Sequence, residues 1–299
     1  MRPALGCALL LLRATTCASV RLGGTGVARS IVRLTDAASQ RPVTLVGTMH
    51  YNPRSVDLVR DVISDAALGA VCIELCAARW NSTTASRWSR ERSLKRVLSE
   101  DEFQVAFETA TDCGLRDVVL ADQPIETTGR RLLAALLATV RDLVAGPAGW
   151  RRVGADLQKL LQQLPTFGAA ALDPLVVAGT PLALARYLYV SPAALPFITV
   201  SAVALAVAAA VDEATGALPA WEDAVVSALV AVTLGRSVFV ALVEERNAVL
   251  ARNIRNACLC DTPVPSSSQP ADEVVAVVGI LHLAGVAAAL QLGDEAQPL

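Results

Sequence analysis

The sequence predicts an α/β protein in which a mostly parallel sheet is covered by helices, with an apolar helical insertion between two parts of the domain. Short apolar runs of strand length alternate with helical patterns along much of the 299-residue chain. These runs are apolar on both faces, as strands buried between two helical layers are. A long, almost uncharged segment rich in alanine interrupts the alternation.

Each expected element has its own local signal. Residues 43–46 form an apolar run that ends at Gly47, and Asn52-Pro53 then opens a helical pattern that stops at Gly69. Strands separated by helices are expected to run parallel, because each helix returns the chain to the same edge of the sheet. The other expected elements are strands at residues 70–75, 118–121 and 274–278 and helices at residues 100–111 and 127–143.

Residues 165–243 form the apolar insertion. Residues 193–211 are uncharged and residues 224–243 carry only Arg236, and either stretch approaches a bilayer core of ~30 Å at ~1.5 Å per residue. A transmembrane hairpin is one interpretation. The other is a buried helical pair, or one that forms homo-oligomers through its small residues. The expected division is a leader at residues 1–40, an α/β domain in two parts at 41–164 and 244–299, and the insertion at 165–243.

The first forty residues are typical of a targeting leader. An apolar stretch at residues 4–12 follows Arg2, and the chain then carries several arginines but no acidic residue before Asp36. A signal followed by an arginine-rich transit peptide favours a plastid membrane as the destination. An ordinary signal peptide of the secretory pathway, or a mitochondrial route, is the alternative.

The overall composition excludes one class of partner. A formal net charge of −2 provides no basic face for phosphates, and 4% aromatic residues offer few platforms for stacked bases, so we expect no nucleic acid. Two of the seven cysteines lie in the leader, and the other five lack the spacing of a disulfide scaffold and are expected to be reduced.

The two histidines are the most informative residues. His50 and His282 each end a Gly-x-x-His motif, and each motif directly follows an expected strand. Groups just beyond the carboxyl ends of parallel strands line the ligand crevice of an open sheet. We therefore expect the two imidazoles to share one site, although a single histidine in such a place is usually structural.

Two carboxylates end the neighbouring expected strands. Glu74 lies in an apolar run, where a carboxylate is costly to bury unless it is paired or binds a metal. His50, His282 and Glu74, with Asp122, are the candidate ligands of a divalent ion such as zinc, manganese or cobalt. Glu74 is also the candidate general base. The structural alternatives are an ion pair between Glu74 and Arg79 and a turn role for Asp122.

Two arginines are candidates for binding a substrate carboxylate or a developing anion. Arg130 and Arg246 have guanidinium groups that can hold two oxygens at once, and each is equally interpreted as a surface or helix-pairing residue. Cys72 and Cys76 flank Glu74, but small buried thiols are commoner than sulfur ligands in such runs.

Taken in order, these motifs resemble those of the TraB/PrgY/GumN family, of which the Tiki proteases are distant relatives. The resemblance covers about residues 42–143 and 243–290. The matching residues are Val46-Gly47-Thr48-Met49-His50; Ile73-Glu74-Leu75-Cys76 with Arg79; Ala121-Asp122-Gln123-Pro124-Ile125 with Thr128 and Arg130; Glu245-Arg246-Asn247; and Val277-Val278-Gly279-Ile280-Leu281-His282 with Gly285.

This resemblance implies a shared α/β fold and, in the Tiki branch, metal-dependent proteolysis by residues that here are His50, His282 and Glu74. Where the family usually has Asp-Arg-Pro, this chain has Asp122-Gln123-Pro124, which removes one cation. The expected function is a metal-dependent hydrolase of a peptide or small molecule, acting from an organelle membrane. The alternative is a non-catalytic membrane adaptor or peptide-sequestering regulator with the same fold.

Overall fold

The computed structural model describes residues 30–86, 100–190, 220–260 and 273–292. The elements run in the order β1 (Ile31–Thr35), β2 (Pro42–Thr48), α1 (Pro53–Asp65), β3 (Leu68–Ile73), α2 (Ala77–Ser86), α4 (Glu102–Asp112), β4 (Val119–Leu120), α5 (Ile125–Val144), α6 (Pro147–Ala171), α7 (Pro174–Val190), α9 (Ala220–Phe239), a π-helical segment η2 (Val240–Glu244), α10 (Glu245–Leu259), β5 (Glu273–Gly279) and α11 (Ile280–Leu292).

The sheet has five strands in the order β1-β2-β5-β3-β4. β2, β5, β3 and β4 are parallel, and only β1 runs antiparallel, at the edge beside β2. The predicted class, a mostly parallel sheet with helices, is therefore confirmed. β5 comes from the end of the chain and enters the middle of the sheet, so the two Gly-x-x-His motifs follow adjacent strands.

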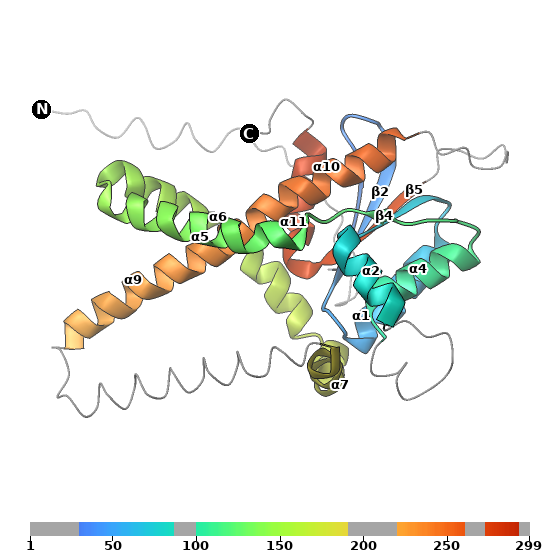
Figure 1. Cartoon of the computed structure of the whole chain (residues 1–299), viewed down its shortest axis with the longest axis horizontal. Helices are drawn as coiled ribbons and strands as arrows, with labels where there is room; N and C mark the ends of the chain where they lie inside the picture. Colours follow the sequence, from blue (N-terminus) through green and yellow to red (C-terminus); the bar gives the residue numbers. More distant parts are fainter. Residues whose placement is uncertain (1–29, 87–99, 191–219, 261–272, 293–299) are drawn as a thin grey trace, which may run out of the picture.

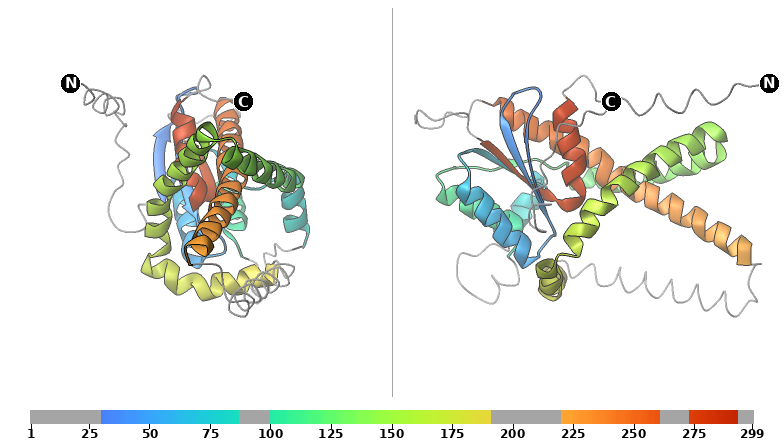
Figure 2. Two further views of the ribbon diagram at one scale, coloured as in Figure 1. Left: turned by 90° about the vertical axis from the view of Figure 1, so that its left-hand side faces the viewer. Right: turned by 180° about the vertical axis from the view of Figure 1, so that it is seen from behind.

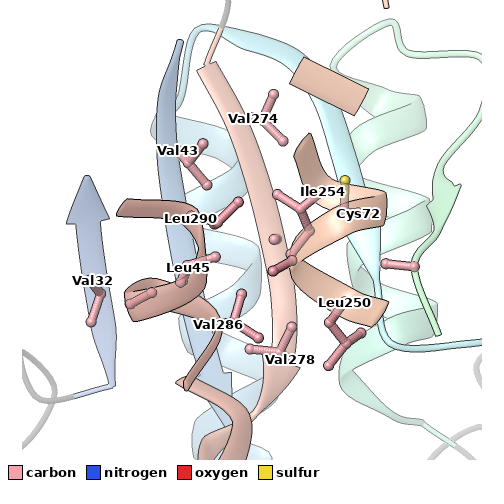
Figure 3. Packing of buried hydrophobic residues seen from close by; sticks show 14 of the residues in the cluster. Val32, Val43, Leu45, Cys72, Leu250, Ile254, Val274, Val278, Val286 and Leu290 are labelled. Atoms are coloured by element: carbon pink, nitrogen blue, oxygen red, sulfur yellow. The ribbon is translucent and has the colours of Figure 1, made fainter. Parts of the chain in front are cut away.

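Helices cover both faces of the sheet (Figure 1). On one face, α10 and α11 pack on the strands through side chains such as Leu250, Ile254 and Leu283, as Figure 3 shows for part of this cluster. On the other face, α1 and α4 pack through Val59, Ile63, Phe103 and their neighbours. Alternate residues of β5 face the two layers, which is why its sequence is apolar throughout.

Local chemistry fixes the start of the two helices nearest the strand ends. The Asn52 side chain accepts a hydrogen bond from Arg54 N, and Pro53 occupies the first turn of α1, where its missing N–H is no loss. The Asp101 side chain caps α4 by accepting from Gln104 N at 2.7 Å. α11 packs closely on Gly47. A Cβ at this residue would lie 2.7 Å from Ile280 Cδ1, so any other residue would force the Ile280 side chain to move.

The structure adds one strand that the sequence did not predict. β1 lies within the segment assigned to the leader, and Asp36 just after it is fully buried. The folded domain therefore includes Ile31. If a leader is cleaved and β1 is kept, the cleavage site lies before Ile31. The strand alternates in burial, with Val32 buried and Arg33 exposed, as expected at a sheet edge.

Two long helical arms project from the sheet domain (Figures 1 and 2). One is the α5–α6 hairpin and the other is α9, which continues through η2 into α10. The continuous helix Ser227–Leu259 is 33 residues long and is long and apolar enough to cross a membrane. Its α10 half is buried against the sheet, so only the α9 half is available for a bilayer. The expected apolar stretch at residues 193–211 lies outside the described residues.

The arms bury Arg236 where they pack together, whereas Arg141 and Lys159 of the α5–α6 hairpin are 74% and 53% exposed. Arg236 of α9 is 7% exposed and donates to Asp156 Oδ2 at 2.7 Å and to Asp142 Oδ2 at 2.9 Å. Leu137 and Leu229, in contrast, are 62% and 40% exposed. The expected domain boundaries at 164/165 and 243/244 fall inside α6 and η2, so neither coincides with the end of a helix.

Candidate functional site

The carboxyl ends of β2, β5, β3 and β4 lie at one edge of the sheet, and each is followed by a predicted site residue. His50 follows β2, His282 lies in the first turn of α11 directly after β5, Glu74 follows β3 and Asp122 follows β4. Because parallel strands end at the same edge, these residues from distant parts of the chain converge there. Arg246 reaches the same edge from α10.

Gly279, the last residue of β5, marks the centre of this cluster. A Cβ built on Gly279 would lie 3.4 Å from Glu74 Oε2, 3.4 Å from His50 Nε2 and 3.6 Å from His282 Cδ2. Because both distances are measured from one point, His50 Nε2 and His282 Cδ2 lie at most about 7 Å apart. The glycine leaves a space between the two rings and the carboxylate that any other side chain would begin to fill.

His50 is held by a residue that the sequence did not single out. Its Nδ1 bonds to Glu102 Oε1, and Glu102 is 1% exposed at the start of α4. Glu102 Oε2 also accepts from Tyr51 N at 3.1 Å, so one carboxylate fixes both the ring and the following peptide. With Nδ1 bonded to Glu102, Nε2 is the ring nitrogen that faces the space at Gly279.

The pairing of His50 with Glu102 also sets the local charge. Partial burial would lower the pKa of His50, whose side chain is 47% exposed, but the negative Glu102 outweighs it and raises the pKa to about 9. Burial likewise favours a protonated Glu102, and the cationic His50 reverses this and lowers its pKa. Asp101 lies next to Glu102, and burial together with that charge raises the pKa of Asp101 to about 7.

His282 is held in a corresponding way by an amide. Its Nδ1 donates to Asn247 Oδ1 at 2.8 Å, and its Nε2 lies 3.4 Å from Glu74 Oε1. Asn247 can approach only because residue 285 is glycine, since a Cβ at Gly285 would lie 2.0 Å from Asn247 Nδ2. Asn247 belongs to the resemblance motif, but nothing in the sequence indicated that it contacts His282.

Glu74 is 2% exposed and is kept ionised by its partners. Its Oε2 accepts from Gly279 N at 2.6 Å, and its Oε1 accepts from Arg246 Nη2. Burial would raise the pKa of Glu74, but the hydrogen bond and charge of His282, with the charges of Arg246 and His50, bring it well below its usual range. A buried carboxylate held in this way remains an anion at neutral pH.

Asp122 lies on the arginine side of the cluster. Its two oxygens accept from Arg246 Nε at 3.1 Å and Arg246 Nη2 at 2.8 Å, a bidentate pair, and Arg79 Nη1 lies 3.4 Å from Oδ2. Arg246 therefore bridges Glu74 and Asp122. Burial would lower the pKa of Arg246, but both carboxylates raise it.

The other sequence candidates lie elsewhere or have another role. Arg130 is exposed on α5 and, in the part of the chain that the structure describes, makes none of the contacts that hold this cluster together. Cys72 is packed in the apolar core between the sheet and α10, and Cys76 is buried.

The donor chemistry of the cluster suits a divalent ion. His50 and His282 each have Nδ1 bonded to an oxygen acceptor, which is how metal-binding histidines are usually oriented, and both rings and a Glu74 oxygen adjoin the same space at Gly279. Among the described residues, however, no three histidine, cysteine, aspartate or glutamate side chains converge closely enough to hold an ion as they stand. Both carboxylates that an ion would use are shared with Arg246.

Comparison with known proteins adds no relative. No protein-family model matches this chain, and no curated protein matches it closely enough to be counted as similar.

Proposed function

We propose that this protein is a metal-dependent hydrolase of the TraB type, possessing a single site built on His50, His282 and Glu74. The observation that supports this most is that both imidazoles and the Glu74 carboxylate lie within 3.6 Å of one point beside Gly279. Structural histidines need no such common orientation toward a shared space. Zinc, manganese and cobalt are all compatible with two nitrogens and a carboxylate.

Each residue of the site would have a separate role, which follows from its charge and position. A bound divalent ion would supply the acidity that makes hydroxide available from water near neutral pH. His50 and His282 would hold it through Nε2, while Glu102 and Asn247 keep the rings in place. Glu74, kept ionised by its partners, would supply the carboxylate ligand through the oxygen nearest Gly279, since a pKa held this low makes it a poor proton acceptor for the attacking water.

Arg246 would neutralise negative charge as it develops on the substrate. It is positioned by Asp122, which receives two of its N–H groups and so fixes the plane of the guanidinium. To reach an oxyanion, Arg246 would exchange its bond to Glu74 for one to the substrate. We therefore assign Asp122 chiefly to positioning Arg246 rather than to direct ligation.

We further propose that the site works from an organelle membrane, with a plastid favoured. α9 is 20 residues long, which at ~1.5 Å per residue matches a bilayer core of ~30 Å, and its arginine is already neutralised inside the bundle of arms. The arginine-rich leader supports the organelle. Carbonate extraction of membranes from expressing cells tests the anchor: the full-length mature chain should stay in the pellet.

A second candidate function is a non-catalytic adaptor. The bridge from Arg246 to Glu74 and Asp122 supports it, because this bridge neutralises both carboxylates without an ion. Metal analysis of the purified full chain by mass spectrometry separates the two. A hydrolase should retain close to one ion per chain and cleave a peptide mixture, and both should be lost in His50→Ala with His282→Ala. A chain without metal, whose cellular role survives Glu74→Gln, would be an adaptor.

A further inference from the structure

The helix α7 has the opposite arrangement to that of a surface helix in water. Its sequence contains a single charged residue, Arg186, and that residue is 3% exposed. Leu175, Val177 and Leu184 are 57%, 53% and 56% exposed. A soluble helix places its charges outward and its leucines inward. Apolar side chains outside and a neutralised charge inside are instead what a lipid environment requires.

The inward face of α7 is fastened to the segment that follows His50. Arg186 Nη1 donates to Tyr51 O at 3.1 Å, and Asn52 Nδ2 donates to Val176 O at 2.9 Å. Gly179 allows this close approach, since a Cβ there would lie 2.9 Å from Asn52 Oδ1. Tyr51 has φ of 61°, a left-handed conformation that its neighbours must hold in place.

A second link joins α7 to the helix that positions His50. Arg186 Nη2 donates to Glu100 Oε2 at 3.1 Å, two residues before Glu102. The buried arginine of α7 thus contacts both segments that fix the His50 ring: its own loop and the start of α4. A displacement of α7 would be transmitted to these two segments first.

The direction of α7 suits a helix lying in the plane of a membrane. The chain turns by 94° between α6 and α7. Figure 1 shows α7 nearly end on while α9 runs across the picture, and Figure 2 shows α7 lengthwise beside the sheet domain. If α9 crosses a bilayer, α7 lies across that direction, near the level at which the arms meet the sheet domain.

We propose that α7 is an interfacial helix whose outward face, which carries Val177 and Leu184, lies in the acyl boundary of a lipid bilayer, and that its inward contacts hold the His50 loop at the membrane surface. The inference rests on the proposed membrane location but not on the proposed hydrolysis. Binding uses apolar area, because the outward face described carries no basic residue, so uncharged phosphatidylcholine suffices as the lipid.

A fluorescence experiment on the full chain tests this helix separately from the α9 anchor. Cys7, Cys17, Cys113 and Cys260 are changed to serine, and bimane is attached after Val177→Cys or, as the matched control, after Leu259→Cys, a residue 56% exposed on α10. The protein is reconstituted into phosphatidylcholine vesicles with or without brominated acyl chains. Bimane at position 177 should be quenched by brominated lipid about twofold or more, and bimane at position 259 should not.

The variants complete the test. Ala178→Glu with Leu184→Glu, both on the outward face, should abolish quenching at position 177 and speed amide exchange in residues 49–54, while the protein still sediments with vesicles through α9. Two results in protein that sediments with vesicles would overturn the inference. Quenching of bimane at position 177 by aqueous iodide would show that water covers this face, and quenching by neither agent would show that another part of the chain covers it. Protein that fails to sediment with vesicles would overturn both the inference and the proposed anchor.

Discussion

Asn247 Oδ1 accepts a hydrogen bond from His282 Nδ1 at 2.8 Å, and this contact exists because Gly285 leaves room for the amide one turn along α11. The bond joins α10 to α11 at the carboxyl edge of the sheet. The orientation of His282, a candidate metal ligand, therefore depends on Asn247 and Gly285, which would contact neither metal nor substrate.

Loss of this contact should weaken metal binding without unfolding the protein. Asn247→Ala leaves His282 free to rotate, and the loss of such a partner typically lowers metal affinity by about 10–100-fold. Gly285→Ala should have a similar effect, because its methyl group would displace Asn247. Isothermal titration with zinc measures both, and Gly154→Ala, where a Cβ meets nothing within 4 Å, is the control.

The double variant distinguishes positioning from general damage. Once Asn247 is alanine, the methyl group at residue 285 has nothing to displace, so Gly285→Ala with Asn247→Ala should bind zinc about as well as Asn247→Ala alone. Additive losses of affinity would mean that the two residues act independently.

Glu102→Gln should lower the pKa of His50 in the metal-free protein. The Glu102 carboxylate is the charge that raises this pKa to about 9, and an amide can still accept the Nδ1 hydrogen without that charge. Proton NMR follows the ring directly, since the chain has only two histidines, and His282→Gln assigns the signals. A His50 pKa that stays near 9 in Glu102→Gln would show that a group other than Glu102 raises it.

The buried pair of Asp36 and Arg255 should make the fold acid-sensitive. Asp36 Oδ1 accepts from Arg255 Nε at 2.9 Å, and both side chains are almost fully buried. Burial would raise the pKa of Asp36, but Ser39 and Arg255 lower it. Because the folded-state pKa is depressed, the stabilisation is present above the ordinary carboxyl range and is lost as pH falls through the folded-state pKa.

Urea unfolding at pH 7 and at pH 3–4 measures this contribution. Asp36→Asn should lower the free energy of unfolding at pH 7 by about 3–5 kcal/mol, since it leaves Arg255 buried without its charge partner. The difference from the parent chain should shrink at the lower pH. Asp57→Asn, in an exposed pair with Arg60, should change stability by about 0–1 kcal/mol at either pH. Equal losses for the two variants would contradict this account of Asp36.

The sequence could predict the strand-end residues but not the residues that hold them. His50, Glu74, Asp122 and His282 each directly follow a parallel strand, and parallel strands end at one edge whatever their order in the chain. Strand order itself was not accessible: nothing local indicates that β5 inserts between β2 and β3.

Glu102 and Asn247 were missed because they reach the site from helices that pack on opposite faces of the sheet. Their positions depend on how α4 and α10 dock, which is a tertiary property. The acidic pair Asp101-Glu102 at the head of an apolar helix was the only local signal, and it is equally typical of an ordinary N-terminal cap. β1 was missed because its alternating pattern follows directly on an arginine-rich stretch typical of a leader.

Cobalt(II) titration of the full chain and of Gly279→Ala tests the central claim most directly. A methyl group at Gly279 would touch His50 Nε2, Glu74 Oε2 and His282 at ordinary contact distances, so it fills the proposed ion site without forcing the fold apart. The parent chain should bind one cobalt ion with a visible d–d absorption, and Gly279→Ala should bind it at least ~10-fold more weakly with an unchanged unfolding midpoint. A parent chain that gives no such absorption, or equal affinity in the two proteins, would contradict the assignment of His50, His282 and Glu74 as a metal site.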